Sequence, residues 1–136
     1  MKKILFLCIG NSCRSQMAEG FANFYGKGKI EAFSAGISPS GVNKYAVQAM
    51  KEAGIDISGQ ESKNVNVFSG REFDYIITLC GSAKENCPFF PGKAVHLHWG
   101  IKDPAPAEGG EDGILNAFRS ARDEIKNNVL DLLGKL

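Results

Sequence analysis

Two adjoining stretches decide the fold: Ile4-Leu5-Phe6-Leu7 and, directly after it, Cys8-Ile9-Gly10-Asn11-Ser12-Cys13-Arg14-Ser15. The first predicts a short buried strand, and the second predicts a tight loop that leads into a helix starting at Ser15. A strand end, a loop and a helix N-terminus together form a cradle of backbone N–H groups that suits a tetrahedral oxyanion. The same positive field favours the thiolate form of Cys8, and Arg14 can close the cradle with a two-pronged hydrogen bond. These stretches therefore predict a cysteine nucleophile that acts on a phosphate-like anion.

The loop itself supplies the expected anion contacts. Ser15 could donate a hydrogen bond to the Cys8 thiolate, and Asn11 could hold the loop in its turn, although both are also ordinary cap or turn residues. A cysteine and an arginine at this spacing recur by chance, and a buried strand cysteine is usually inert. Here the spacing coincides with a strand end, a turn and a helix start, which favours the catalytic interpretation. The expected anion-binding residues are Gly10, Asn11, Ser12, Cys13, Arg14 and Ser15.

Apolar patterning along the rest of the chain predicts alternating strands and helices. Strands are expected at residues 2–8, 30–35, 73–79 and 94–99, with a short strand or extended piece at 55–57. Helices are expected over 15–25, from Pro39 and Ser40 to a left-handed cap at Gly54, and over about 112–133, with a loop over 81–92. This alternation predicts an α/β fold, a three-layer open sheet of about four parallel strands flanked by helices, in a single domain over residues 1–136.

The carboxyl ends of the strands in such a sheet meet at one edge, where ligands bind. Cys8, Cys80 and Asp103 each follow a predicted strand or strand-like segment, so we expect them to converge there. Asp103, placed opposite the nucleophile, could donate a proton to the leaving oxygen as a general acid. Asp-Pro is also an everyday turn, so this dipeptide alone carries little weight.

Composition indicates one ordinary globular domain. The chain has 136 residues, of which 43% are hydrophobic and 23% charged, and its formal net charge is +1. So weak a charge predicts no binding to nucleic acid or to an anionic membrane surface, and any anion recognition must be local. The apolar run at residues 4–9 is too short for a signal peptide, and no segment approaches the length of a membrane span. We therefore expect a cytoplasmic protein whose thiols are kept reduced.

The four cysteines fall into two pairs, Cys8 with Cys13 and Cys80 with Cys87. Structural zinc sites typically use two closely spaced Cys-x2–4-Cys knuckles, and the wider spacing of the second pair argues against one. Cys80 ends a predicted strand, and Cys87 lies in a loop bounded by glycines. This placement favours two thiols that meet when the loop rearranges over two incidental cysteines.

A metal site is the other chemistry that the pattern could hold. His96 and His98 alternate on a predicted strand and so share a face. No cysteine or carboxylate at ligand spacing accompanies them, so packing or surface roles are expected and no metal site is predicted.

Four motifs along the chain resemble those of one family. They are Cys-Ile-Gly-Asn-Ser-Cys-Arg-Ser-Gln-Met-Ala-Glu-Gly at 8–20, Thr-Leu-Cys-Gly at 78–81, Asn-Cys-Pro at 86–88 and His-Trp-Gly-x-x-Asp-Pro-Ala at 98–105. In this combination and order they are similar to the motifs of the thioredoxin-coupled arsenate reductases, which share the fold of the low-molecular-weight protein tyrosine phosphatases. The resemblance covers nearly the whole chain.

The resemblance implies a reaction, the reduction of arsenate to arsenite in arsenic detoxification. Cys8 would attack arsenate held by the loop N–H groups and Arg14, with Asp103 as the acid for the leaving hydroxide. Cys80 would then attack the adduct, which releases arsenite and forms a Cys8–Cys80 disulfide, and Cys87 would convert that bond to Cys80–Cys87. Reduced thioredoxin would clear the second disulfide. The resemblance implies no tightly bound cofactor, competition by phosphate and sulfate, and a monomer.

Some members of that family bind a potassium ion beside the anion loop. The positions that match its ligands are Asn11, Glu19 and Ser34, plus a carboxylate after Gln-x-Ser. Here Gln60-Glu61-Ser62 is followed by Lys63, and lysine cannot ligate a cation. The sequence therefore argues against a potassium site, and the Lys63 ammonium group could occupy the same place.

Two other functions stay open. A phosphotyrosine phosphatase of the same fold would need the nucleophile, the arginine and the acid, but not the second thiol pair. Such phosphatases usually carry an aromatic residue just after Asp-Pro, where this chain has Ala105-Pro106-Ala107. Hydrolysis of aryl phosphates is expected from the shared site as a minor activity. The third possibility is a redox-sensing or regulatory binding module without turnover.

Overall fold

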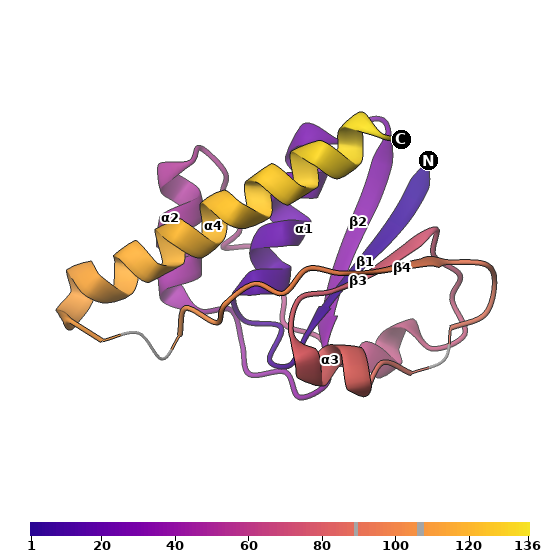
Figure 1. The fold of residues 1–136 in the computed structure, drawn as a ribbon, viewed down its shortest axis with the longest axis horizontal. Helices are drawn as coiled ribbons and strands as arrows, with labels where there is room; N and C mark the ends of the chain where they lie inside the picture. The colour runs from indigo at the N-terminus through magenta and orange to yellow at the C-terminus, as the bar shows by residue number, and fades with distance from the viewer. Residues whose placement is uncertain (89, 106–107) are drawn as a thin grey trace.

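The structure is a computed structural model that describes residues 1–88, 90–105 and 108–136. Its centre is one sheet of four parallel strands in the order β2-β1-β3-β4 (Figure 1). The sheet confirms the predicted open α/β fold. The strands are β1 (Lys2–Cys8), β2 (Ile30–Gly36), β3 (Tyr75–Thr78) and β4 (Val95–His98).

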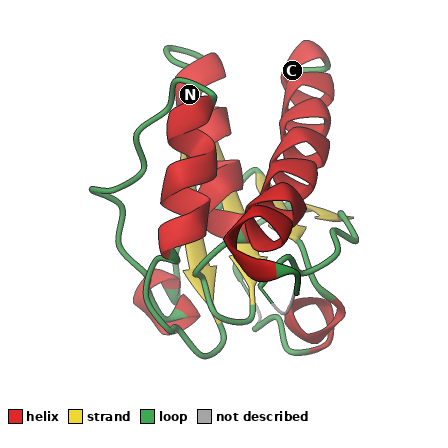
Figure 2. Ribbon diagram, turned by 90° about the vertical axis from the view of Figure 1, so that its left-hand side faces the viewer, coloured by secondary structure: helices red, strands yellow, loops and turns green. Residues whose placement is uncertain are grey.

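Helical segments and loops cover both faces of the sheet. On one face α4 packs along α1 and α2 (Figures 1 and 2), and on the other face lie η1 and α3. Alternate side chains of β1 point to the two faces, so residues 4–8 are all buried. This two-sided burial explains the continuous apolar run at the start of the chain. The helical segments are α1 (Arg14–Tyr25), α2 (Lys44–Glu52), the 3-10 helix η1 (Val65–Phe68), α3 (Gly81–Glu85) and α4 (Gly110–Gly134).

Helix α2 begins at Lys44, not at Pro39 and Ser40 as the sequence predicts. The residues before it are used to hold the anion loop, residues 8–15. Their N–H groups donate to loop carbonyl oxygens: Ser38 to Ile9 (2.8 Å), Ser40 to Gly10 (2.9 Å) and Asn43 to Ser12 (2.9 Å). The helix starts only after this, where the Asn43 side chain accepts a hydrogen bond from the N–H of Tyr45 (2.8 Å). The predicted left-handed cap at Gly54 is confirmed, with φ of 83°.

Residues 55–57 do not form the strand that their apolar character allows. Ile55 and Ile57 are buried in the core on the face of the sheet that α1, α2 and α4 cover. Their side chains therefore fill the core beneath the helices. In the sequence, a short apolar run that fills the core looks the same as a short buried strand.

The segment 81–92 is only partly the loop that the sequence predicts, because α3 forms over Gly81–Glu85. The helix places Ala83 in the core on the second face of the sheet, fully buried. Phe90 is buried in the same core and meets the Phe73 ring edge to face, with ring centroids 5.7 Å apart. Phe89 lies outside the described residues. The helix turns the Ala83 side chain into the core, and a sequence pattern typical of a loop does not predict that burial.

Among the helices of the described residues, none combines the length and the apolar character needed to cross a bilayer.

Candidate active site

The carboxyl ends of the strands bring together three of the predicted catalytic residues and, beside them, three predicted anion-binding residues, Gly10, Ser12 and Cys13. A cavity of about 230 Å³ is lined by Cys8 at the end of β1, Arg14 at the start of α1 and Asp103 beyond β4. The other lining residues are Ile9, Gly10, Ser12, Cys13, Ser40 and Ala105. Asn11 and Ser15 belong to the loop but are fully buried and are not among the described lining residues of the cavity, so their side chains support the cradle from within the protein.

Cys8 is held by a serine whose own proton is free to donate. The residue is 3% exposed, and its sulfur lies 2.9 Å from Ser15 Oγ. Asn11 Nδ2 donates to the same hydroxyl oxygen (2.8 Å). Because a serine hydroxyl has one proton, accepting from Asn11 leaves that proton for the sulfur. The arrangement directs the Ser15 hydroxyl proton toward the Cys8 sulfur.

Asn11 carries the strain of the loop. Its φ of 45° lies in the left-handed region, which asparagine tolerates better than most residues. Its Oδ1 accepts a hydrogen bond from the N–H of Lys63 (2.8 Å). Gly36, at the end of β2, makes room for the loop, since a Cβ there would lie 2.8 Å from both Asn11 N and Ile9 O. The turn-holding role predicted for Asn11 agrees with this geometry.

Arg14 ties the segments that follow β3 and β4 to the anion loop. Its guanidinium is buried, and one nitrogen donates to Ile101 O (2.9 Å) and Leu79 O (3.4 Å). The other terminal nitrogen lies 3.7 Å from a carboxylate oxygen of Asp103. The second oxygen of Asp103 accepts from the N–H of Ala105 (3.0 Å), as in a common Asx turn. The guanidinium is thus held by two carbonyl groups through one nitrogen, while its other terminal nitrogen faces Asp103 at the cavity wall.

Cys13 is a buried thiol whose pKa is raised above its ordinary value. Burial raises the pKa of Cys13 to about 11, and the Ser12 hydroxyl, 3.4 Å from its sulfur, lowers that pKa only in part. A thiol with this pKa stays protonated at neutral pH. Its role in the cradle is therefore packing next to the nucleophile, not nucleophilic attack.

We expect iodoacetamide at pH 8 to leave Cys13 unmodified in the folded protein. With a pKa of about 11, on the order of 0.1% of this thiol is ionised at that pH, and only the thiolate reacts. Peptide mapping by mass spectrometry measures the modification. Alkylation of Cys13 in native protein as fast as in urea-unfolded protein would contradict the buried, protonated thiol.

Cys80 and Cys87 form the second pair of cysteines, which follows β3. All four cysteines are free thiols, and those of the second pair are half-buried. The Cys80 sulfur accepts from the N–H of Ala83 in α3 (3.4 Å), and burial raises the pKa of Cys87. Neither residue is among the described residues that line the cavity. Leu7 and Thr78 are paired in register on β1 and β3, so Cys8 and Cys80 follow neighbouring strand ends.

The positions that would match a potassium site hold a positive charge of the protein's own. Glu19 accepts a hydrogen bond from Ser34 Oγ (2.8 Å), and burial raises its pKa while Ser34 and the charge of Lys63 lower it in part. The Lys63 ammonium group donates to Glu61 O (2.7 Å). A cation beside Glu19 would be repelled by Lys63, so these residues fit a potassium ion poorly. Among the described residues, no cluster of three or more His, Cys, Asp or Glu could hold a metal.

The two strand histidines have ordinary surroundings. His98 Nδ1 lies 2.8 Å from Thr78 Oγ1, a contact that joins the ends of β4 and β3, and His96 is exposed. This agrees with the packing or surface roles expected from the sequence.

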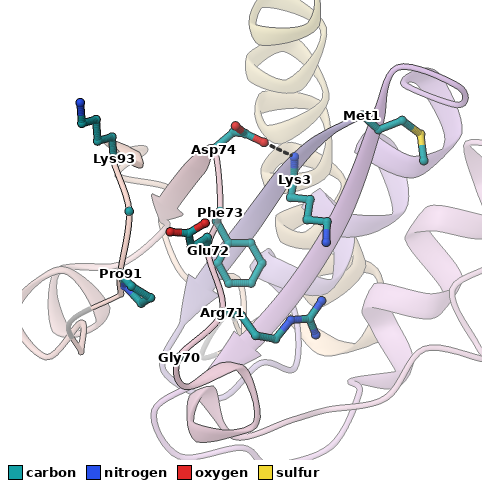
Figure 3. Close-up of a pocket in the computed structure, with 10 residues that line it drawn as sticks. Met1, Lys3, Gly70, Arg71, Glu72, Phe73, Asp74, Pro91 and Lys93 are labelled. Carbon is teal, nitrogen blue, oxygen red and sulfur yellow. Dashed lines mark hydrogen bonds between the residues drawn. The ribbon is translucent and has the colours of Figure 1, made fainter.

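A larger hollow, of about 1000 Å³, lies at the opposite end of the sheet (Figure 3). It is open to solvent near the amino ends of β1 and β3, where the Asp74 carboxylate accepts from the N–H of Lys3 (2.8 Å). Arg71 lies over the Phe73 ring at 5.9 Å. The hollow is lined by side chains of both charges, and its described lining residues are all different from those of the Cys8 cavity. In parallel sheets ligands bind at the carboxyl ends of the strands, so the smaller cavity is the candidate active site.

Sequence reasoning missed the residues that support the loop from outside it. Ser40 donates its N–H to Gly10 O, and Gly36 leaves room for the loop backbone. Gln16 donates to Asn11 O in the loop, and Gln60 donates to Gln16. Only the glycine at a strand end gives a sequence signal, because it permits a close backbone approach. The others are common polar residues whose partners are distant in sequence.

Comparison with known proteins agrees with this site. The family model for low molecular weight phosphotyrosine protein phosphatases matches residues 3–136. The arsenate reductase of Bacillus subtilis (strain 168) is 48% identical over 128 residues, which are 94% of this chain and 92% of that protein. The glutaredoxin arsenate reductase of Synechocystis sp. is 41% identical over 137 residues, which are 100% of this chain and 99% of that protein.

A solved structure described as an arsenate reductase in the phosphate binding state is 39% identical to this chain. It aligns over 99% of this chain and 98% of its own, with a TM-score of 0.80. Fold, site and sequence thus agree, and the chain belongs to the low molecular weight phosphotyrosine protein phosphatase family.

Proposed function

We propose that this protein is an arsenate reductase in which Cys8, Cys80 and Cys87 pass oxidation from substrate to a protein reductant. One observation supports this most: the cavity that gathers Cys8, Arg14 and Asp103 lies at the same sheet edge as Cys80, which belongs to a second pair of free thiols. A phosphatase needs the first group only. The second pair gives the site the two electrons that reduction requires.

The first step is a substitution at arsenic. The Cys8 thiolate attacks arsenate, which the loop N–H groups and Arg14 hold by hydrogen bonds to its oxygens. A sulfur–arsenic bond forms, an arsenic–oxygen bond breaks, and Asp103 protonates the departing hydroxide. Asp103 is placed for this role because it lines the same cavity as Cys8 and its carboxylate is open to solvent, from which it can take up a proton.

The second step is the reduction. The Cys80 thiolate attacks the Cys8 sulfur, the sulfur–arsenic bond breaks, and its electron pair stays on arsenic, which leaves as arsenite. The new Cys8–Cys80 disulfide is then attacked at Cys80 by Cys87. Cys8 is released as a thiolate, and the Cys80–Cys87 disulfide remains. Oxidation formed in a closed cavity is thereby moved to a segment that a partner can reach.

This relay requires α3 to change its structure. A disulfide needs Cα atoms about 4.4–6.8 Å apart, and Cys80 must meet that limit first with Cys8 and later with Cys87. Helix α3 (Gly81–Glu85) begins directly after Cys80, and its Ala83 is fully buried. Because α3 lies between Cys80 and Cys87 and a helix rises about 1.5 Å per residue, formation of the Cys80–Cys87 disulfide displaces this packed helix.

In the oxidised protein we expect faster amide hydrogen exchange across residues 81–92 than in the reduced protein. Loss of α3 removes its backbone hydrogen bonds and exposes the segment around Ala83. Hydrogen exchange with mass spectrometry compares the two states, and peptide mapping confirms that the oxidised sample carries Cys80–Cys87. Equal protection of this segment in the two samples would contradict a switching loop; α1 serves as the internal control.

Thioredoxin is the reductant that we propose. The relay ends in an intramolecular disulfide of two nearby cysteines, which a protein dithiol clears by exchange in two steps. We further propose that the protein works as a monomer in the cytoplasm, with no tightly bound cofactor, and that phosphate and sulfate compete for the anion loop.

The reductant is tested by arsenate-dependent NADPH oxidation. Two coupled systems are compared: thioredoxin with thioredoxin reductase, and glutaredoxin with glutathione and glutathione reductase. Turnover with the first and little with the second is expected. The reverse result would assign the protein to glutaredoxin, in line with the name of its Synechocystis relative.

Hydrolysis of aryl phosphates is proposed as a minor activity of the same cradle. It requires the nucleophile, Arg14 and the acid, all of which line one cavity. Ala105 contributes a small side chain where phosphotyrosine phosphatases would need an aromatic wall, while Pro106 and Ala107 lie outside the described residues. A weak wall for the phenyl ring favours low affinity for such substrates.

A further inference from the structure

Residues 60–63, which we call the strap, are hydrogen-bonded to the anion loop. Ser62 Oγ donates to Gly10 O (3.2 Å), and the N–H of Lys63 donates to Asn11 Oδ1 (2.8 Å). The strap is itself anchored to the sheet, because Gly36 at the end of β2 donates its N–H to Lys63 O (2.8 Å). The relay described above uses none of these strap residues.

Gln16 connects the strap to the strained residue of the loop. Its side chain is fully buried, and its Nε2 donates to Asn11 O (3.0 Å) and to Glu61 O (2.9 Å). Its Oε1 accepts from Gln60 Nε2 (2.8 Å), and the same Gln60 nitrogen donates to Gln16 O (3.0 Å). Both ends of the buried amide are thus satisfied, each by a different partner.

Gln60 holds the oxygen end of the Gln16 amide, while the carbonyl groups of Asn11 and Glu61 accept from its nitrogen end. Without the Gln60 donor, the buried Gln16 oxygen loses its described hydrogen-bond partner, and the amide is held against Asn11 from its nitrogen end only. The consequence reaches the nucleophile, since Asn11 has a φ of 45° and also holds the Ser15 hydroxyl against Cys8.

Gly20 on α1 leaves room for Ile57, which lies shortly before the strap in the sequence. A Cβ at Gly20 would lie 2.7 Å from Ile57 Cγ2 and 3.5 Å from Gln60 Oε1. Glycine inside a helix lowers its stability, so its place in α1 calls for a packing reason. The close approach of the segment 57–60 to α1 is that reason.

We propose that Gln60 is a positioning residue, which acts through Gln16 on Asn11 to hold the anion loop in its oxyanion-binding conformation. Gln60 is absent from the described lining of the cavity, so its effect is on geometry alone. The proposal rests on the proposed function, in which this loop binds arsenate. It predicts that loss of the Gln60 donor weakens the binding of tetrahedral oxyanions in protein that is still folded.

The test uses Gln60→Met, which keeps the length of the side chain and removes its donor. Inorganic phosphate is the probe, and the readout is the phosphate concentration that half-protects Cys8 from iodoacetamide in the reduced protein. We expect this concentration to rise roughly tenfold, the effect of losing about one hydrogen bond. Gln48→Met is the matched control, because Gln48 is exposed on α2 and the same change there should leave protection unchanged.

A folded Gln60→Met variant whose half-protecting phosphate concentration stays within about twofold of the parent overturns the proposal. A lower melting temperature with unchanged protection overturns it as well, because that result indicates a merely structural role. If Gln60→Met does not fold, Gln60→Glu replaces it, because an ionised carboxylate cannot donate to Gln16. Failure of phosphate to protect Cys8 in the parent protein would instead contradict the proposed function.

Discussion

Replacing Cys8 with serine is expected to abolish arsenate reduction, with a loss of more than about 10⁴-fold in turnover. A serine hydroxyl is barely ionised at neutral pH, so it cannot replace the thiolate that Ser15 holds by its hydroxyl (2.9 Å). The same variant should lose aryl phosphate hydrolysis, since both reactions begin with attack by this residue. Arsenate-dependent NADPH oxidation measures the loss of arsenate reduction. Release of nitrophenol from nitrophenyl phosphate measures the loss of aryl phosphate hydrolysis.

Phosphate binding separates a chemical loss from a folding loss in this variant. The loop N–H groups and Arg14 are intact in Cys8→Ser, so isothermal calorimetry should still detect phosphate. Near-parent rates of arsenate reduction in Cys8→Ser would remove Cys8 as the nucleophile. Bound phosphate with no turnover would agree with the assignment.

The second large effect is expected at the other two thiols of the relay. Cys80→Ser and Cys87→Ser should each stop repeated turnover of arsenate, by about 10³-fold or more, because exchange needs a thiolate at each step. The two variants should stop at different points. Cys80→Ser retains arsenic on Cys8, whereas Cys87→Ser releases one arsenite and stops as a Cys8–Cys80 disulfide.

Hydrolysis of a small aryl phosphate is the internal control for this pair. Phosphate transfer uses the cradle, the nucleophile and the acid, so both variants should keep most of that activity. If both variants instead reduce arsenate at the parent rate with thioredoxin, the relay is wrong and a phosphatase function gains support. Mass spectrometry of quenched reactions identifies the species at which each variant stops.

The sequence predicted the structure well where the local residue pattern and the tertiary packing favour the same secondary structure. Strand β1 (Lys2–Cys8) is continuously apolar because both of its faces are covered, and α1 buries Met17 and Phe21 one helical turn apart. Where it failed, distant hydrogen bonds decided the outcome. Ser40 is kept out of a helix because its N–H binds Gly10 O in the anion loop. No local pattern around Ser40 reveals that partner.

The candidate site divides in the same way. The rule that parallel strands gather their carboxyl ends predicted that Cys8, Cys80 and Asp103 would converge; Cys8 and Asp103 line one cavity, whereas Cys80 is not among its described lining residues. The braces behind the loop could not be predicted, since Gln16 and Gln60 are ordinary polar residues until the fold brings them within 2.8 Å. The roles of Cys80 and Cys87 stay predictions, because they depend on a movement of α3.

A single-turnover reaction tests the central claim most directly. Fully reduced protein is mixed with an equimolar amount of arsenate in the absence of any external reductant, then quenched, and arsenite, free thiols and disulfide-linked peptides are measured. The relay predicts one arsenite released per protein, the loss of two thiols, and a disulfide that joins Cys80 to Cys87 while Cys8 is again free. Unchanged arsenate with all four thiols still free when they are counted in unfolded protein, or arsenite released with a disulfide that excludes Cys87, would contradict it.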